Sequence, residues 1–345
     1  MVKKSFLNKL ERCHRIYEQL HQDPLMPVYE IARNTDLSRN TVSKYLHEML
    51  DRTFLLGPYL RMKATPTYRE YVYLANFSDP KLKFTALSHF PPVIDVVHTF
   101  GDWNTLLVTN QPLDMPRMHG FQNQVLSEYK YSTITPKTEF TSWNAAFVKA
   151  SKILEDPGPP SQLRRVLAPH LDWGEDQWKI YNIFNFNMRK IVTLSLRKVL
   201  VRFETYATWK EDLKTHCTMH TGFYPRSYSQ YTGHWFLFSS SYESLVVKVF
   251  GCLPVTPCIV ETGHYLLVFV NTVSSSALKR LTDLVVDMKT EGLVREVKYG
   301  LVLREAHNPI DFSPFMRKEE KDHGKKEERR KGPDRDRGAL SHGPC

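Results

Sequence analysis

The stretch VYEIARNTDLSRNTVSKYLHEMLD, residues 28–51, predicts two short helices joined by a tight turn. The first helix is expected over residues 29–34, and the turn falls at Thr35 and Asp36. Ser38 follows the turn, where its hydroxyl can accept a hydrogen bond from a free backbone N–H in the first turn of the next helix. The stretch is therefore typical of a helix-turn-helix.

The second helix of this stretch has two chemically different faces. Val42, Leu46 and Met49 recur at helical spacing and form an apolar face. The opposite face is polar and cationic, and consists of Asn40, Ser43, Lys44 and His47, with Arg39 on its flank. Such a face suits the edge of a DNA groove, although an ordinary amphipathic helix with a solvated face has the same pattern.

The segment that follows, FLLGPYLRMKAT (residues 54–65), predicts two short strands around a Gly57-Pro58 turn. The second strand carries Arg61 and Lys63. Together with a first helix over residues 5–22, this hairpin completes a winged helix-turn-helix. Residues 1–64 hold 11 basic and 7 acidic side chains, a net charge of +4, which favours a polyanionic partner.

The composition bounds the class of protein. The chain has 345 residues, 41% hydrophobic content and a formal net charge of +10. It has no apolar run long enough to span a bilayer and no secretory signal in its first residues, so we expect a cytoplasmic protein without a membrane partner. Five scattered cysteines predict no disulfide framework. Cys217 near His216 and His220 is a weak metal motif, and buried thiol and surface histidines are the favoured interpretation; no metal and no cofactor are expected.

Residues 67–140 change character. REYVYLANF alternates like a strand, a helical stretch follows, and VIDVVHTF and NTLLVTNQ are strands joined at Gly101 and Asp102. This β-α-β-β order is the front of a ferredoxin-like α+β unit. The remaining helix and strand are expected within residues 114–140.

The combination resembles the Lrp/AsnC family of prokaryotic transcription regulators. The helix pair with LSRNTVSKYLHEM, the wing GPYLRMKA and the hairpin HTFGDWNTLLV carry the resemblance. It implies DNA binding by the winged helix and a RAM-like domain that binds a small-molecule effector, often an amino acid. The hairpin residues Gly101, Asp102, Gly263 and His264 are then candidate effector positions. The alternative for the glycines is a tight turn that needs a positive φ.

After a linker the pattern repeats, so the fold class is α+β, with a winged helix-turn-helix and a ferredoxin-like βαββαβ domain occurring twice. The expected domain boundaries are 1–66 and 67–140, a linker over 141–175 with a helical piece around 144–154, then 176–230, 231–306, and a charged disordered tail over 307–345.

The second winged helix is degenerate. A shift of 167 residues places Trp209 on Val42 and Leu213 on Leu46, so the packing positions stay apolar. On the outer face, however, Ala207 replaces Asn40 and Glu211 replaces Lys44. Since a carboxylate is repelled by phosphates, the second copy is weakened for DNA reading.

The sequence therefore predicts a sequence-specific transcription regulator, not an enzyme and without catalytic residues. Its partners are double-stranded DNA and a possible effector, and its RAM-like units pair within the chain as a pseudo-dimer or between chains as a homo-oligomer. The DNA-binding residues are expected to be Ser38, Arg39, Asn40, Thr41, Ser43, Lys44 and His47, with Arg61 and Lys63 on phosphates.

One alternative is enzymatic. Sirohaem decarboxylases of tetrapyrrole biosynthesis resemble Lrp/AsnC proteins over the same two domains. The two modules, the many Tyr and Trp residues and the basic residues able to meet propionates fit this alternative. Against it stand the DNA-compatible first helix and the absence of any recognisable catalytic spacing. A purely structural, oligomeric interaction protein is a further alternative.

Overall fold

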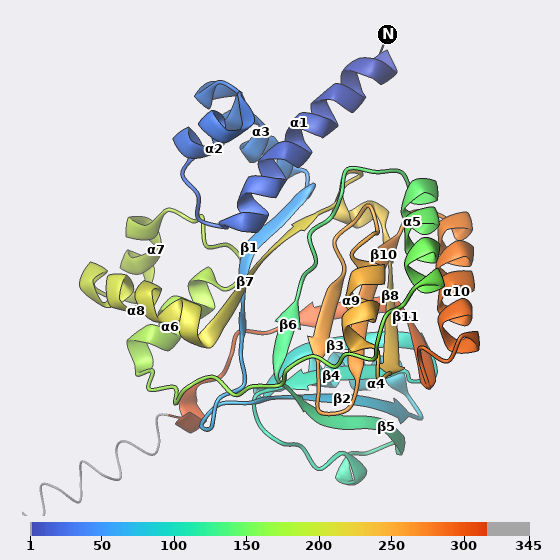
Figure 1. The fold of residues 1–345 in the computed structure, drawn as a ribbon. Helices are drawn as coiled ribbons and strands as arrows, with labels where there is room; N and C mark the ends of the chain where they lie inside the picture. Colours follow the sequence, from blue (N-terminus) through green and yellow to red (C-terminus); the bar gives the residue numbers. More distant parts are fainter. Residues whose placement is uncertain (1, 316–345) are drawn as a thin grey trace, which may run out of the picture. The chain divides into compact units, whose positions relative to one another are not determined.

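The computed structural model describes residues 2–315. Residues 316–345, most of the predicted tail, lie outside the described residues. The fold is α+β with antiparallel sheets (Figure 1).

The helices predicted at the start of the chain are present as α1 (Val2–Gln22), α2 (Val28–Thr35) and α3 (Arg39–Asp51). The Ser38 hydroxyl accepts a hydrogen bond from the Thr41 amide at 3.1 Å, which confirms the predicted cap. The three helices bury one another's apolar faces, and this core contains Ile16, Tyr17, Leu20, Ile31, Val42, Leu46 and Met49.

The predicted two-stranded wing is wrong. Gly57 and Pro58 do not reverse the chain; they lie inside one strand, β1 (Leu55–Met62), which pairs antiparallel with β7 (Cys217–Phe223) from the far half of the chain. Gly57 takes a φ of +87° and the pairing register shifts there, as at a bulge. The long partner satisfies more backbone groups than a hairpin of two very short strands could, so long-range pairing prevails.

A second group of helices precedes β7 in the chain and lies together beside it: α6 (Glu175–Phe184), α7 (Val192–Val199) and α8 (Phe203–His216) (Figure 1). The predicted packing residues Trp209 and Leu213 are buried. Trp209 belongs to an aromatic cluster with Trp173, Trp178, Tyr181, Phe184 and Tyr206.

The segment after α1–α3 forms β2 (Glu70–Phe77), α4 (Pro80–Leu87), β3 (Val93–Gly101), β4 (Thr105–Thr109) and β5 (Phe121–Lys130). The second helix expected before the last strand is absent from this described segment. A short 3-10 turn, η1 (Met115–Arg117), stands in its place. Pro112, Pro116 and Gly120 explain the difference, because proline removes a helical donor and glycine disfavours a helix.

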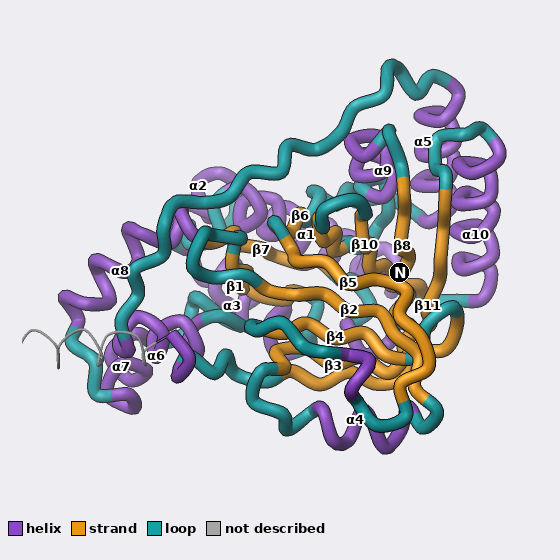
Figure 2. The backbone as a smooth tube through the Cα atoms, turned by 90° about the horizontal axis from the view of Figure 1, so that it is seen from below, coloured by secondary structure: helices purple, strands orange, loops and turns teal. Residues whose placement is uncertain are grey.

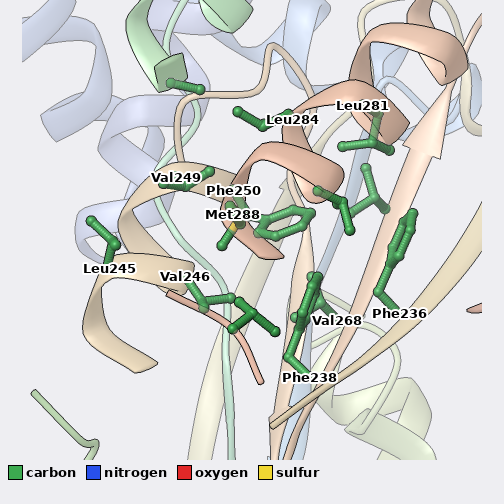
Figure 3. Close-up of a cluster of buried hydrophobic side chains, with 14 of the residues drawn as sticks. Phe236, Phe238, Leu245, Val246, Val249, Phe250, Val268, Leu281, Leu284 and Met288 are labelled. Carbon is green, nitrogen blue, oxygen red and sulfur yellow. The ribbon is translucent and has the colours of Figure 1, made fainter. Parts of the chain in front are cut away.

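The last third of the chain has the complete βαββαβ order. Its elements are β8 (Thr232–Ser239), α9 (Glu243–Phe250), β9 (Cys258–Glu261), β10 (Leu266–Thr272), α10 (Ser275–Thr290) and β11 (Glu296–His307). The helices α9 and α10 and the linker helix α5 (Trp143–Glu155) cover one face of these strands. Figure 3 shows the core beneath them, in which Phe236, Phe238 and Val268 meet Phe250, Leu281 and Met288.

The strands of these two segments and β6 (Ser132–Ile134) form one sheet, separate from the β1–β7 pair. Its strand order is β5-β2-β4-β3-β11-β8-β10-β9-β6. Figure 2 shows β5, β2, β4 and β3 side by side. Only Tyr131 separates β5 at one edge from β6 at the other, and its amide donates to the Glu261 carbonyl at 2.8 Å. The sheet must therefore curve until its two edges meet. Its inner face encloses an apolar core built from both halves: Val72, Leu74, Val97, Trp103, Leu106, Leu126, Leu237 and Leu267.

Candidate functional site

Beside this inner core, the curved sheet encloses a cavity of about 400 Å³. β1, the loop after β7 and Phe186, just after α6, contribute the rest of its wall. Most of the lining is apolar or aromatic, and a smaller part is charged. The charged and aromatic lining residues are Tyr59, Arg61, Glu70, Asp95, Lys130, Phe186, Tyr224, Tyr228, Trp235, Phe269, Glu305 and His307.

Arg61 reaches the cavity from β1. Its guanidinium carbon lies 5.0 Å from the centroid of the Tyr59 ring, and His220 stacks on that same ring at 5.5 Å between centroids. Burial disfavours the charge on Arg61, but Asp95 and nearby phenols keep its pKa above the ordinary value, so the side chain stays cationic. Within the described part of the chain, its guanidinium makes no ion pair or hydrogen bond. It is a cation available to a ligand.

Lys130 and Glu70 form a buried ion pair in the cavity wall. They are directly opposite residues of β5 and β2, with 4% and 5% of their surface exposed. The Lys130 ammonium donates to Oε2 of Glu70, and the Tyr68 hydroxyl donates to Oε1 at 3.2 Å. Each charge is neutralised by the other, as burial requires.

Asp95 and His307 form a second pair, opposite each other on β3 and β11. His307 Nδ1 donates to Oδ1 of Asp95. The Asp95 carboxylate raises the pKa of His307, which favours the imidazolium. Burial would raise the pKa of Asp95, but His307, Arg61 and Lys130 outweigh burial and lower it to about 2. His307 therefore faces the cavity as an acid with its own fixed counter-ion.

Two tyrosines from the loop after β7 stand at the cavity wall. Tyr224 and Tyr228 meet edge to face at 5.0 Å, and burial raises the pKa of both, so both remain neutral phenols. The Tyr228 amide donates to the Thr53 carbonyl at 3.0 Å, and the Tyr224 amide to the Phe54 carbonyl at 2.7 Å. The segment just after α3 thus fixes this part of the cavity wall.

Seven of the nine residues predicted to contact DNA lie together on α3 or at its N-terminus. Arg39, Asn40, Ser43, Lys44 and His47 are exposed on α3, as expected, and Ser38 and Thr41 form its first turn. Nε2 of His47 lies 3.1 Å from Oδ2 of Asp51.

The two predicted wing cations lie elsewhere. Arg61 faces the cavity, and the Lys63 ammonium donates to the carbonyls of Lys214 and Thr215 at 2.8 and 3.1 Å. Their prediction as phosphate ligands on a wing was wrong, because β1 pairs with β7 instead of folding back on itself.

The predicted effector hairpins hold the two halves of the sheet together. The Tyr299 amide on β11 donates to Oδ2 of Asp102 at 2.7 Å, and the Asp102 amide donates back to the Tyr299 carbonyl at 2.8 Å. In the other direction, the His264 amide donates to Oε2 of Glu128 on β5 at 3.0 Å. Gly101 and Gly263 lie in the same turns, and none of these four hairpin residues lines the cavity.

The weak metal motif is dispersed. Nδ1 of His216 lies 3.0 Å from Oδ2 of Asp212, whereas the two ring nitrogens of His220 contact the hydroxyls of Thr135 and Thr218. Burial, with Arg61 and Lys130, lowers the pKa of His220 to about 3. Over residues 2–315 no group of three or more His, Cys, Asp or Glu side chains could hold a metal ion, and no helix is long and apolar enough to cross a bilayer.

Sequence reasoning missed the charged residues of the cavity. Glu70 is the first residue of the largely apolar strand in REYVYLANF, and Asp95 lies inside the strand VIDVVHTF. A lone carboxylate in a buried strand is rare unless it has a partner, and this was the available signal. Their partners Lys130 and His307 lie 60 and 212 residues away, so the pairs themselves had no local pattern.

No family model and no curated protein matches the chain. Two solved structures are similar in fold. The siroheme decarboxylase NirDL has a TM-score of 0.47 at 9% identity, covering 92% of this chain and 99% of that one. The same enzyme in complex with an iron-uroporphyrin III analogue has a TM-score of 0.45 at 11% identity, covering 90% and 98%.

These findings correct the predicted function. The wing on which the predicted DNA binding depended does not form, and its two cations, Arg61 and Lys63, are placed elsewhere. The prediction of a DNA-binding transcription regulator is therefore wrong. The prediction that the protein is not an enzyme is undermined as well, because the structure contains a cavity lined by acidic and basic side chains.

Proposed function

We propose that the protein is an enzyme that binds a carboxylate-bearing tetrapyrrole in the cavity and removes carboxyl groups as carbon dioxide. The observation that supports this proposal is the Arg61 guanidinium, which faces an aromatic-walled cavity without a bonded anionic partner. A fixed cation in an apolar enclosure selects a ligand that is largely apolar and carries a carboxylate.

The cavity suits a flat ligand of this class. Its volume of about 400 Å³ falls within the usual size of small-molecule sites, about 300–1,000 Å³. Trp235 and Phe269 offer ring surfaces on which a macrocycle can stack. Arg61 can bind a side-chain carboxylate through two parallel hydrogen bonds, a geometry that lysine does not provide.

His307 is the candidate proton donor. Loss of carbon dioxide breaks the bond between the carboxyl carbon and its neighbour and leaves the electron pair on that neighbour. That carbon then takes up one proton, so the overall reaction needs no oxidant or reductant. His307 is held by Asp95 through Nδ1, which leaves Nε2 as the nitrogen that can donate the proton.

We also propose that the chain is a tandem duplication whose two α+β units pair with each other as an internal pseudo-dimer. The repeated element order, the β3–β11 pairing and the two reciprocal hairpin contacts support this proposal. Each unit then contributes one residue to the Asp95–His307 pair, so the reactive site depends on both.

The test is a titration of the full chain with iron-uroporphyrin III, followed by its Soret absorption, and a mass-spectrometric assay for carbon dioxide loss from siroheme. Arg61→Ala should weaken binding about tenfold or more, since hydrogen bonds to charged groups contribute about 1.5–3 kcal/mol. Lys63→Ala removes an equal charge two residues further along the chain, just after β1 and outside the cavity, and should bind like the parent. An unchanged Soret band, or equal loss in both variants, would sink the proposal, and binding without carbon dioxide loss would reduce it to a binding protein.

A further inference from the structure

The helix α7 and the turn that joins it to α8 expose an unusual amount of apolar surface. Ile191, Leu194, Leu200 and Phe203 retain 66%, 53%, 92% and 58% of their surface in solvent. Ile191 and Leu194 lie on the outer side of α7, whose Ser195 and Leu196 are buried, while Leu200 and Phe203 flank the turn itself. We call these four residues the apolar tip.

The backbone conformation of Leu200 is also unfavourable for a leucine, so the stability of the fold does not explain why this exposed residue is a leucine. Leu200 is the C-cap of α7 and has left-handed backbone angles, φ 58° and ψ 34°. Its counterpart in the first helix pair is Asp36, with φ 54° and ψ 40°. Aspartate tolerates this conformation, whereas other residues with a Cβ lose about 1–2 kcal/mol there. Leu200 thus has an unfavourable conformation and gains no burial in return, so packing within this chain does not account for a leucine here.

The surface around the tip is cationic. Residues 186–204 contain five basic side chains and one acidic one, the exposed Glu204. Lys190, Arg197, Lys198 and Arg202 are exposed, whereas Arg189 donates to the carbonyls of Pro24 and Met26. The matching turn of the first helix pair has the opposite character, since Asp36, Ser38, Arg39 and Asn40 are its exposed residues. Of the two turns, the one between α7 and α8 is therefore the one that combines exposed leucine and phenylalanine side chains with cations.

We propose that the apolar tip docks the protein on an anionic phospholipid surface. Apolar side chains enter the interfacial layer and the surrounding cations bind the headgroups, the combination that peripheral membrane segments use. A second copy of this chain is a poor occupant, because a two-fold contact would oppose the same cations to each other. The proposal is independent of the activity in the cavity, and it revises the expectation that the chain has no membrane partner.

The expected affinities follow from the groups involved. Withdrawing one leucine side chain from water contributes about 1.5–3 kcal/mol, roughly a tenfold to hundredfold change in binding. Each basic residue near an anionic surface contributes about 1 kcal/mol, roughly fivefold, and the attraction weakens with salt. The Leu200→Asp variant should lose both the apolar contact and part of the charge, so it should bind at least tenfold more weakly.

The experiment is co-sedimentation of the full chain with vesicles of phosphatidylcholine alone or of equal parts phosphatidylcholine and phosphatidylglycerol, at low and high salt. We expect binding to the anionic vesicles only, weakened by salt and by Leu200→Asp. Leu82→Asp on α4 replaces another exposed leucine (62%) beside two lysines and should bind like the parent. Leu200→Asp copies the residue of the first helix pair, so its unfolding midpoint should stay equal or rise.

The contrary results are clear. Equal binding to both vesicle types, no binding at all, or identical losses in the two variants would overturn the proposal. Sedimentation velocity of the parent and of Leu200→Asp adds one more contrary outcome, since self-association removed by the substitution would show that a second copy covers the tip.

Discussion

The Arg61 guanidinium lies over the ring of Tyr59, two residues earlier on the same strand, with 5.0 Å between guanidinium carbon and ring centroid. Alternate residues of a strand share one face, so both side chains enter the cavity from β1. His220 stacks behind Tyr59 on the paired strand β7. The ring thus orients the one cation of the cavity that has no bonded partner among the described residues.

Removing this ring should weaken ligand binding without unfolding the protein. Tyr59→Leu loses a cation–π contact of about 0.5–2 kcal/mol and a stacking surface, so the dissociation constant for iron-uroporphyrin III should rise about threefold to thirtyfold. Tyr29→Leu, at an exposed position of α2, is the control and should bind normally. Equal affinity of Tyr59→Leu and the parent would show that Arg61 needs no support from the ring.

The Asp95–His307 pair predicts a specific pH profile of stability. His307 has a raised pKa, so its stabilisation is complete below about 6.5, the ordinary value of histidine, and is lost as the pH rises through the raised one. Asp95 has a pKa lowered to about 2, so its stabilisation is present above about 3.9 and is lost as the pH falls towards that value. Between about pH 4 and 6.5 both partners are charged and the pair stabilises most.

Denaturant unfolding across this range, with NMR titration of His307, checks the profile. Asp95→Asn should flatten the unfolding free energy over the window and lower the pKa of His307. Asp51→Asn removes the carboxylate beside His47 on the surface of α3 and should leave the profile intact, since exposed pairs contribute little. A His307 pKa that does not respond to Asp95→Asn would contradict the coupling.

The buried Lys130–Glu70 pair should be sensitive to loss of one partner. Lys130→Met leaves Glu70 charged and buried, which should reduce the free energy of unfolding by about 3–5 kcal/mol. Combining it with Glu70→Leu should restore much of that loss. The control is Lys149→Met, which breaks the half-exposed pair with Glu139 and should cost less than about 1 kcal/mol. Similar losses of unfolding free energy in Lys130→Met and Lys149→Met would show that the Lys130–Glu70 pair is hydrated.

The joint between the two sheet halves depends on Gly101. A Cβ at this position would lie 2.2 Å from the Tyr299 carbonyl oxygen, and its φ of +150° disfavours other residues. Gly292 after α10 has a φ of +71° but nothing within 4 Å of an added Cβ. Gly292→Ala should therefore lower the free energy of unfolding by about 1–2 kcal/mol from backbone strain alone. Gly101→Ala should lower the free energy of unfolding further, as measured by denaturant titration. Equal losses in the two variants would mean that β11 moves away from the added Cβ without a loss of stability.

Local patterns predicted much of the secondary structure. Helical spacing of Val42, Leu46 and Met49, the Ser38 cap and the strand alternations around Gly101 are all present where they were expected. The errors arose where distant partners decide. The Gly57-Pro58 turn became a bulge because β7 was available to pair, and the segment around Pro116 lacks the donors and propensity for a helix.

The sequence by itself determined the helix-turn-helix at residues 28–51, the two runs of strands and helices, and the α+β class, because these depend on side-chain periodicity within a few turns or one strand. Only the tertiary structure decided which side chains of those elements come together in the cavity. Pairing of β1 with β7 and of β3 with β11 carried Arg61, Asp95 and His307 into one cavity. Since strand pairing joins residues with no fixed separation along the chain, no local pattern encodes it, and a predicted DNA-binding wing became a wall of the cavity.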